Sequence, residues 1–160
     1  MPREKFKIRE RNKNFYGGGV ILYHNRQLLL QKRDDKEYWE DFGGKTEKVD
    51  EKILETALRE CHEESNGVIS KDFVMKRLQE CPKKCHPVYQ GNTYFIQLIY
   101  ITRKQKREMC LEKFGDEECH DGIRRKVEWV RMDSKLHPRI RKGNLYGSSA
   151  FVKFTDQPIL

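Results

Sequence analysis

The chain lacks the sequence features of membrane and secreted proteins. None of its apolar runs approaches the roughly 20 residues needed to cross a bilayer, and its first residues do not form a signal-peptide pattern. Its 5 cysteines are an odd number without regular spacing, which argues against a disulfide framework. Internal repeats and low-complexity linkers are also missing. We therefore expect a protein without membrane contact, cytoplasmic or alternatively nuclear, with reduced thiols.

The length and the charge of the chain indicate one polar domain. Its 160 residues suffice for a single domain, residues 1–160, that buries about two-thirds of its unfolded surface. The net charge is +8, and residues 1–14 form a basic N-terminal arm. Three more basic clusters lie at residues 103–107, 124–126 and 139–142. Such a surface favours polyanions and makes RNA a candidate partner, although a plain solvated basic surface explains each cluster equally well.

Hydrophobic patterns predict a mixed sheet with one long helix. We expect strands over residues 15–23, 27–32, 92–102 and 127–132, helices over 50–66 and 148–154, and loops over 81–87 and 103–122. Residues 73–78 form a short apolar segment of undefined structure. Gly17 to Gly19 lack the following helix of a nucleotide-binding fingerprint, so close packing of strands explains them better than a phosphate cradle.

Three carboxylates share one face of the predicted helix. At about 100° per residue, Glu60, Glu63 and Glu64 fall within an arc of roughly 100°. An apolar stripe adjoins them, made of Ile53, Leu54, Ala57, Leu58 and Cys61. Like charges this close repel one another, and a divalent cation offsets that repulsion. Because all the donors are oxygens, we expect a hard ion, Mg²⁺ or Mn²⁺.

The ends of this helix also have recognisable signals. Asp50 is a natural N-cap, and Val49 and Leu54 stand at the spacing of a hydrophobic staple. Asn66 and Gly67 predict a left-handed C-terminal cap. Before the helix, Gly43 and Gly44 let the backbone come close to a ligand.

The segment from Phe42 to Val68 resembles the signature of the Nudix hydrolase family. That signature is a Gly, five residues, a Glu, seven residues, and then Arg-Glu-apolar-x-Glu-Glu-x-Gly-apolar. Here Gly44 begins it and Arg59 to Glu64 match it position for position. Residues 39–47 and 127–130 are similar to flanking family elements, so the resemblance covers roughly residues 16–135.

Two departures from the Nudix signature fall outside the helical carboxylates. Six residues instead of five separate Gly44 from Glu51, unless Asp50 takes the Glu position. Gly67 comes one residue late, with Asn66 where the family has Gly. Since Asn tolerates the left-handed conformation, the second departure is mild, and the first affects the geometry of the loop.

The resemblance implies an α/β fold, a Nudix-like α/β/α sandwich with a central mixed sheet. It further implies a Mg²⁺- or Mn²⁺-dependent pyrophosphohydrolase that cleaves a phosphoanhydride bond in a nucleoside-diphosphate-linked substrate, such as a nucleotide, a dinucleoside polyphosphate or an RNA 5′ end. Two alternatives stay open: a diphosphoinositol polyphosphate phosphohydrolase, and a non-catalytic Nudix-like module that binds nucleotide or RNA. The oligomeric state is not indicated.

The resemblance and the residue chemistry together give a set of candidate site residues. The catalytic candidates are Arg59, Glu60, Glu63 and Glu64, and Glu60 is either a ligand or the general base. The metal candidates are Gly44 through its carbonyl, Glu47, Glu60, Glu63, Glu64, and a loop carboxylate, Glu118 or Asp121. The substrate candidates are Lys32, Arg33, Lys45, Trp39 and Phe42, although packing in the core is the default for each aromatic side chain.

Overall fold

A computed structural model describes residues 6–91, 93–117 and 122–132 of the chain. The described elements, in chain order, are β1 (Ile8–Glu10), β2 (Lys13–Phe15), β3 (Gly17–His24), β4 (Gln27–Arg33), β5 (Phe42–Lys45), α1 (Ile53–Glu64), α2 (Lys71–Glu80), the 3-10 turn η1 (Pro82–Lys84), β6 (His86–Gln90), β7 (Tyr94–Tyr100), α3 (Arg103–Glu108), the 3-10 turn η2 (Leu111–Phe114) and β8 (Arg125–Arg131). The predicted helix at residues 148–154 lies outside the described residues.

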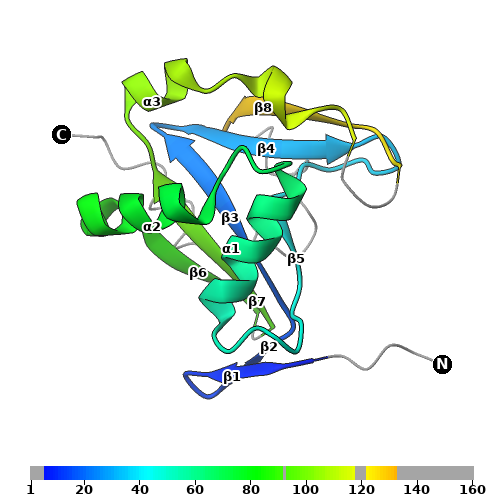
Figure 1. Cartoon of the computed structure of the whole chain (residues 1–160), viewed down its shortest axis with the longest axis vertical. Helices are drawn as coiled ribbons and strands as arrows, with labels where there is room; N and C mark the ends of the chain where they lie inside the picture. The colour runs from blue at the N-terminus through cyan, green and yellow to red at the C-terminus, as the bar shows by residue number, and fades with distance from the viewer. Residues whose placement is uncertain (1–5, 92, 118–121, 133–160) are drawn as a thin grey trace.

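The core of the molecule is a mixed sheet, as the sequence predicts. Its strand order is β6-β7-β3-β4-β8, and β5 pairs with the first half of β3. Strands β3 and β7 run parallel, and the other pairs are antiparallel. Helix α1 lies across one face of the sheet, where it contacts β3, β5 and β7 (Figure 1). Helix α1 therefore packs on β5, the strand that contains Gly43 and Gly44.

The glycines of β3 allow close packing of the neighbouring elements, as the sequence interpretation favoured. Every residue from Gly17 to Tyr23 is buried, because β3 has neighbours on both edges and a helix above it. A Cβ atom at Gly18 would lie 3.5 Å from the Cβ of Ala57 in α1 and 3.2 Å from the carbonyl oxygen of Phe95 in β7. Larger residues here would push α1 away from the sheet.

Two predicted loops and one segment of undefined structure contain regular structure. The expected loop at residues 103–122 contains α3 and η2, and Thr102 and Gln105 form a capping box at the start of α3. The apolar segment at residues 73–78 belongs to α2, whose N-cap Ser70 accepts a hydrogen bond from the backbone N–H of Phe73. The expected loop at residues 81–87 contains η1 and the start of β6. The caps are local sequence signals, and the weak apolar periodicity of these polar segments concealed the helices.

The described part of the basic N-terminal arm is a hairpin that docks against the domain. Strands β1 and β2 pair through a turn at Arg11 and Asn12, which both have positive φ. The carboxylate of Glu10 accepts a hydrogen bond from the backbone N–H of Ile53, 3.0 Å away at the start of α1. Ile8, two residues earlier on the same face of β1, is also buried and anchors the hairpin. From residue 6 onward the arm is thus part of the folded domain.

Two further expectations concern membranes and thiols. Within residues 6–91, 93–117 and 122–132, no helix is both long enough and apolar enough to cross a membrane. The four cysteines in these ranges, Cys61, Cys81, Cys85 and Cys110, are free thiols, as expected.

Candidate active site

Helix α1 begins later than predicted and ends as predicted. Its N-cap is Lys52, which makes no side-chain cap, and Val49 is 71% exposed, so the proposed Asp50 cap and hydrophobic staple are wrong. The carboxylate of Glu10, from the hairpin, satisfies the first N–H of the helix instead. At the other end Gly67 has a φ of +80°, and its N–H donates to the carbonyl oxygen of His62, which confirms the left-handed cap.

Arg59 organises the charges around α1. Its Nε and Nη2 atoms donate to the two oxygens of Asp50 at 3.1 and 2.8 Å, and its Nη1 donates to Glu60 at 2.8 Å. Nη1 also lies 3.5 Å from Glu47 and 3.6 Å from Glu63. The Arg59 side chain is 12% exposed, so these ion pairs are only partly screened by water. One cation thereby holds four carboxylates from the loop and the helix.

Asp50 is the carboxylate of the loop that pairs with Arg59. Burial alone would raise the pKa of its carboxyl group, but hydrogen bonds from Arg59, the backbone N–H of Glu47 and the hydroxyl of Thr56 lower that pKa below its ordinary value. Asp50 therefore stays ionised and fixes Arg59. Glu51 is exposed, and its carboxylate forms no ion pair with Arg59. Of the two residues that could take the Glu position of the signature, Asp50 and Glu51, the one in contact with Arg59 is Asp50.

Glu60 lies directly against the backbone of β5. A Cβ atom on Gly44 would overlap its carboxylate, so the absence of a side chain at that position makes room for it. Burial raises the pKa of Glu60, and the opposing effect of Arg59 does not fully offset it. Such a desolvated carboxylate gains from any added cation. The contact between Gly44 and Glu60 therefore places a poorly solvated carboxylate against the backbone of strand β5.

Glu64 is held by side chains from strands β4 and β8. Its Oε2 accepts a hydrogen bond from Nε2 of Gln31 at 3.1 Å, and its backbone carbonyl accepts one from Arg125. Arg125 also donates to Oε1 of Gln31 at 2.6 Å and to the carbonyl oxygen of Phe114 at 2.9 Å. Gln31 and Arg125 are both almost fully buried. This chain of bonds fixes the C-terminal end of α1 against β4 and β8.

A buried aspartate lies beneath the Gly-Gly segment. Asp41 is 4% exposed, and its Oδ2 accepts a hydrogen bond from the hydroxyl of Tyr94 at 2.7 Å. Burial, with the charges of Asp41 and Glu64 nearby, raises the pKa of the Cys61 thiol. The negative potential therefore extends from the helix surface into the core beneath β5.

A profile of the NUDIX domain matches residues 15–145 of the chain. The chain belongs to the NUDIX family. Two solved structures of a bifunctional NMN adenylyltransferase/ADP ribose pyrophosphatase from Francisella tularensis are similar in fold, and one of them is a complex with AMP and a manganese ion. They share 15% and 16% identity with this chain, at a TM-score of 0.51 each.

The similar solved structures are much longer than this NUDIX chain. They cover 91% and 89% of this chain, which in turn covers 43% and 42% of theirs. At this level of identity the likeness concerns the fold. A search of curated protein sequences found no match.

The two aromatic candidates for stacking on a substrate lie in the core of the NUDIX domain. Phe42 is fully buried against Phe114, with ring centroids 5.5 Å apart, and Trp39 is 5% exposed. Neither ring offers a free face in this conformation, so the structure supports the default of core packing. Side chains alternate between the two faces of β5, and this alternation turns Phe42 towards the core. The sequence pattern did not predict to which face Phe42 would point.

The three basic candidates are spread over two strands. Lys32 and Arg33 end β4 beside β8, and Arg33 donates two hydrogen bonds to Asp35 at 3.1 and 3.2 Å. Lys45 ends β5 with an exposed side chain, and its carbonyl oxygen accepts a hydrogen bond from Arg59. Of the three, Lys45 is nearest in sequence and structure to the carboxylates.

Three of the metal candidates, Glu47, Glu60 and Glu63, lie around Arg59, whereas Glu64 contacts Gln31, so the candidates do not form a closed set of ligands. The Glu47 side chain is 60% exposed and that of Glu63 is 39% exposed, whereas Glu60 is 13% exposed. Within the described ranges, no three Asp, Glu, His or Cys side chains converge on a common ion position. Glu118 and Asp121 lie outside the described residues. Oxygen donors packed against the glycines of β5 fit a hard cation, and their present partners are Arg59 and Gln31.

The supporting residues Gln31, Asp41, Tyr94 and Arg125 were not found by sequence reasoning. They come from β4, the segment before β5, β7 and β8, and nothing in their local sequence distinguishes them from ordinary strand residues. Their contacts with the site depend on the strand order alone.

Proposed function

We propose that this chain is a divalent-metal-dependent pyrophosphohydrolase that cleaves a phosphoanhydride bond. The observation that carries this proposal is the position of Glu60, a poorly solvated carboxylate that packs against Gly44 of β5. Glu63 and Glu64 belong to the same helix as Glu60. A face so rich in negative charge favours a cation. Membership of the NUDIX family supports the same reaction class.

Each residue of the site has a distinct part in this proposal. Glu60, Glu63 and Glu64 would hold Mg²⁺ or Mn²⁺ with the carbonyl of Gly44, and Glu47 would assist from the loop. When bound, the ion would neutralise phosphate oxygens and lower the pKa of a water molecule. Asp50 fixes Arg59, and Arg59 orients the glutamates. Gln31 and Arg125 hold Glu64 in place from below.

We infer a nucleoside-diphosphate-linked substrate as the most fitting class. The fold resembles that of a protein described as an ADP ribose pyrophosphatase, crystallised with AMP and manganese. The net charge of +8 also favours a strongly anionic substrate. Exposed Lys45, beside the carboxylates, is the candidate to contact a phosphate.

The decisive experiment is a hydrolysis panel with product identification. It would include ADP-ribose, nucleoside triphosphates, dinucleoside polyphosphates, 5′-triphosphorylated RNA and diphosphoinositol phosphates, each with Mg²⁺, with Mn²⁺ and with EDTA. We expect metal-dependent cleavage of a nucleotide-linked diphosphate. Cleavage of diphosphoinositol phosphates alone would favour the alternative substrate class, and no cleavage of any member would favour a non-catalytic module.

A pair of variants separates catalysis from folding. Glu64→Gln removes a charge from the candidate metal site, and we expect it to lower turnover by at least about a hundredfold. Glu55→Gln removes an equal charge from the first turn of the same helix, where the side chain is exposed, and turnover should stay within about twofold. Full activity in Glu64→Gln, with an unchanged metal requirement, would overturn the assignment.

A further inference from the structure

Two thiols lie in contact at the end of helix α2. Cys81 is the C-cap of α2, and Cys85 comes just before β6, with the turn η1 between them. Their Sγ atoms are 3.5 Å apart. Both sulfurs also lie near the carbonyl oxygen of Arg77, at 3.0 Å from Cys81 and 3.9 Å from Cys85. A disulfide needs about 2.05 Å between its sulfur atoms, so a movement of roughly 1.5 Å joins them.

The two thiols differ in their exposure to water. Cys85 is 6% exposed, whereas Cys81 is half-buried. Burial raises the pKa of the Cys85 thiol above its ordinary value, and the neighbouring Cys81 thiol raises that pKa further. Cys85 therefore stays protonated at neutral pH and is shielded from solvent. Cys81 is the sulfur of the pair that a dissolved oxidant reaches first.

The other described thiols have no such neighbour. Cys61 is 1% exposed in the core, and Cys110 is exposed. Within residues 6–91, 93–117 and 122–132, neither of them contacts another sulfur atom. The fifth cysteine, Cys119, lies outside these ranges. Because contact makes the joining of two sulfurs intramolecular, Cys81 and Cys85 are the described thiols placed to react with one another.

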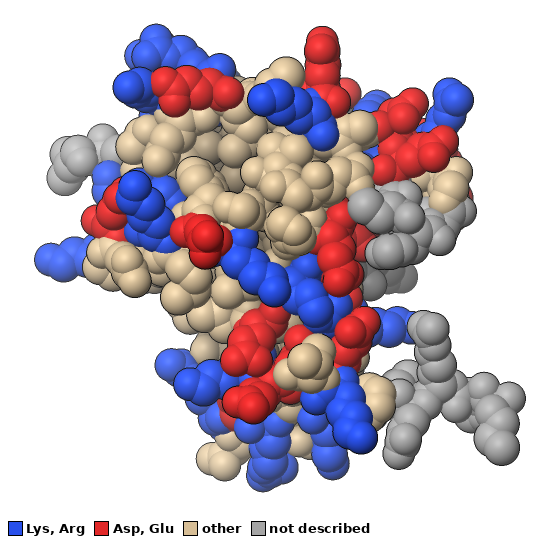
Figure 2. All heavy atoms as spheres, viewed as in Figure 1, with Lys and Arg blue, Asp and Glu red and all other residues tan. Residues whose placement is uncertain are grey.

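The charges near the pair favour the reactive form of Cys81. Residues 77–85 contain three cations, Arg77, Lys83 and Lys84, and one carboxylate, Glu80. The Nζ atom of Lys84 lies 4.5 Å from the ring centroid of Tyr100, and Arg77 donates to the carbonyl oxygen of Tyr100 at 2.9 Å. Basic side chains lie together with acidic ones around α2 (Figure 2). Nearby positive charge stabilises the thiolate, which is the nucleophile in thiol oxidation.

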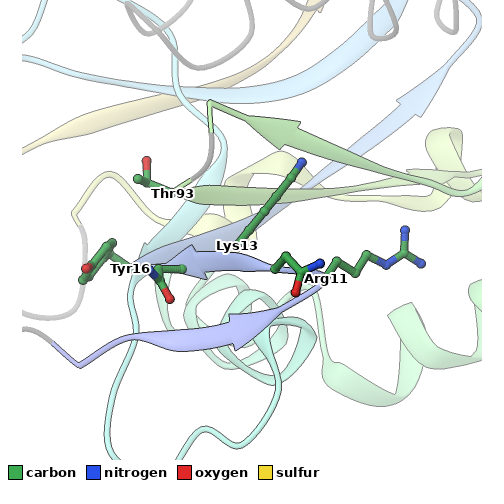
Figure 3. Close-up of a pocket in the computed structure, with 6 residues that line it drawn as sticks. Arg11, Lys13, Tyr16 and Thr93 are labelled. Carbon is green, nitrogen blue, oxygen red and sulfur yellow. The ribbon is translucent and has the colours of Figure 1, made fainter.

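The two cavities of the described chain do not open onto this pair. One, of about 630 Å³, has Cys110 in its wall, together with residues of α2 and α3. The other, of about 600 Å³, lies beside the β1–β2 hairpin, and no sulfur atom belongs to its wall (Figure 3). Neither cavity is lined by Cys81 or Cys85. The pair therefore suits a small oxidant, hydrogen peroxide, better than a bulky disulfide.

We propose that Cys81 and Cys85 form a redox-modification site, at which hydrogen peroxide converts the two thiols into a reversible disulfide. The Cys81 thiolate attacks one peroxide oxygen, the O–O bond breaks, and the hydroxide that leaves takes up a proton to become water. The Cys85 sulfur then attacks the resulting sulfenic acid of Cys81, loses its proton as the S–S bond forms, and releases a second water. Two thiols are oxidised, and one peroxide is reduced to two waters.

This disulfide ties the end of α2 to an edge of the sheet. Strand β6 is the edge strand, with β7 as its neighbour, and α2 contacts β7. The modification thus joins two elements that otherwise meet through β7. A dithiol reductant restores the two thiols. Because the helical carboxylates take no part, this inference stands or falls separately from the proposed hydrolase activity.

Peptide mapping of the full chain tests the proposal. The reduced protein is exposed to hydrogen peroxide, its remaining thiols are alkylated, and it is digested with trypsin. Trypsin cleaves between the two cysteines, so the disulfide joins residues 78–83 to residues 85–103. The variants Cys85→Ser and Cys110→Ser/Cys119→Ser are treated in the same way, and a sample in urea reports on the unfolded chain. Melting temperatures confirm that each variant is folded.

We expect the linked peptide in the wild type and in Cys110→Ser/Cys119→Ser, with a loss of about 2 Da that dithiothreitol reverses. Cys85→Ser should instead leave Cys81 as a sulfenic acid, which dimedone traps, and should increase the irreversible oxidation of Cys81 about fivefold or more. Oxidation of Cys110 without the linked peptide would overturn the proposal. A link that forms only in urea, or a Cys81 product that is the same with and without Cys85, would also overturn it.

Discussion

The face of helix α1 and the β1–β2 hairpin both carry dense charge, but they hold it in opposite ways. On α1 a single arginine, Arg59, whose side chain is 12% exposed, contacts Asp50 and Glu60 at 2.8 Å and lies within 3.6 Å of two more carboxylates. On the hairpin, Arg11 and Lys13 lie over the ring of Tyr89 and pair with no described carboxylate. The first set of charges is neutralised within the protein, and the second is left for solvent or a ligand.

This difference separates charges that maintain the fold from charges that are left to the solvent. A partly buried ion pair is costly to break because the remaining charge is poorly solvated. An exposed cation is solvated with or without a partner, so its removal changes the fold little. Glu10 connects the two regions, because it lies on the hairpin and caps α1. Four substitutions test how far this contrast holds.

The largest expected effect is that of Arg59→Ala. It leaves Asp50, whose side chain is 3% exposed, and Glu60 without their main cation, so the free energy of unfolding should fall by about 3 kcal/mol. The matched variant Arg11→Ala removes the same side chain from the hairpin, where we expect a change within about 0.5 kcal/mol. Urea denaturation measures both. Similar losses in the two variants would remove the contrast between the regions.

Gly44→Ala should come next, with its effect on activity. The new Cβ overlaps the Glu60 carboxylate, which must turn away from β5 and weaken its bond to Arg59. We expect turnover of the substrate found in the hydrolysis panel to fall about 10- to 100-fold. Gly91→Ala is the control, since a Cβ there meets nothing within 4 Å although its φ is +58°. Equal turnover in the two variants would mean that the contact between Gly44 and Glu60 is unimportant.

The pH dependence of stability distinguishes Glu60 from an exposed glutamate. Because burial raises its pKa in the folded state above the ordinary 4.5, its contribution to stability is fully present below about pH 4.5 and is lost as the pH rises through the raised pKa. In the variant Glu60→Gln the side chain does not ionise, so this contribution to stability is not lost as the pH rises. Its stability relative to the wild type should therefore increase as the pH rises from about 4 to 7, as measured by urea denaturation at each pH. A difference that stays constant with pH would contradict the burial of the charge.

The smallest expected effect is that of Glu10→Ala. The substitution removes the acceptor for the first N–H of α1 and should cost about 1 kcal/mol, as the loss of a helix cap usually does. Arg9→Ala, with an exposed side chain on the same strand, should change the free energy of unfolding by less than about 0.5 kcal/mol. Thermal unfolding of the two variants makes the comparison. If Glu10→Ala has no effect, the hairpin and α1 are energetically independent.

Local patterns predicted the parts of the molecule that depend on neighbouring residues. The strands that became β3, β4, β7 and β8, the helix with its three glutamates, and the cap at Asn66 and Gly67 all follow from periodicity and turn chemistry. The helix start was wrong by about two residues, because Asp50 pairs with Arg59 instead of capping the helix. A local capping rule does not include a stronger competing partner nine residues away along the chain.

The sequence by itself determined the NUDIX signature, the placement of Glu60, Glu63 and Glu64 on one face of a helix, and the central strands. Only the tertiary structure decided which group holds each charge: Asp50 and Glu60 on Arg59, Glu64 on Gln31, and Arg11 and Lys13 on Tyr89. The physical reason is range. Helical and strand periodicities act over a few residues, whereas the solvation of a charge depends on every element that folds against it.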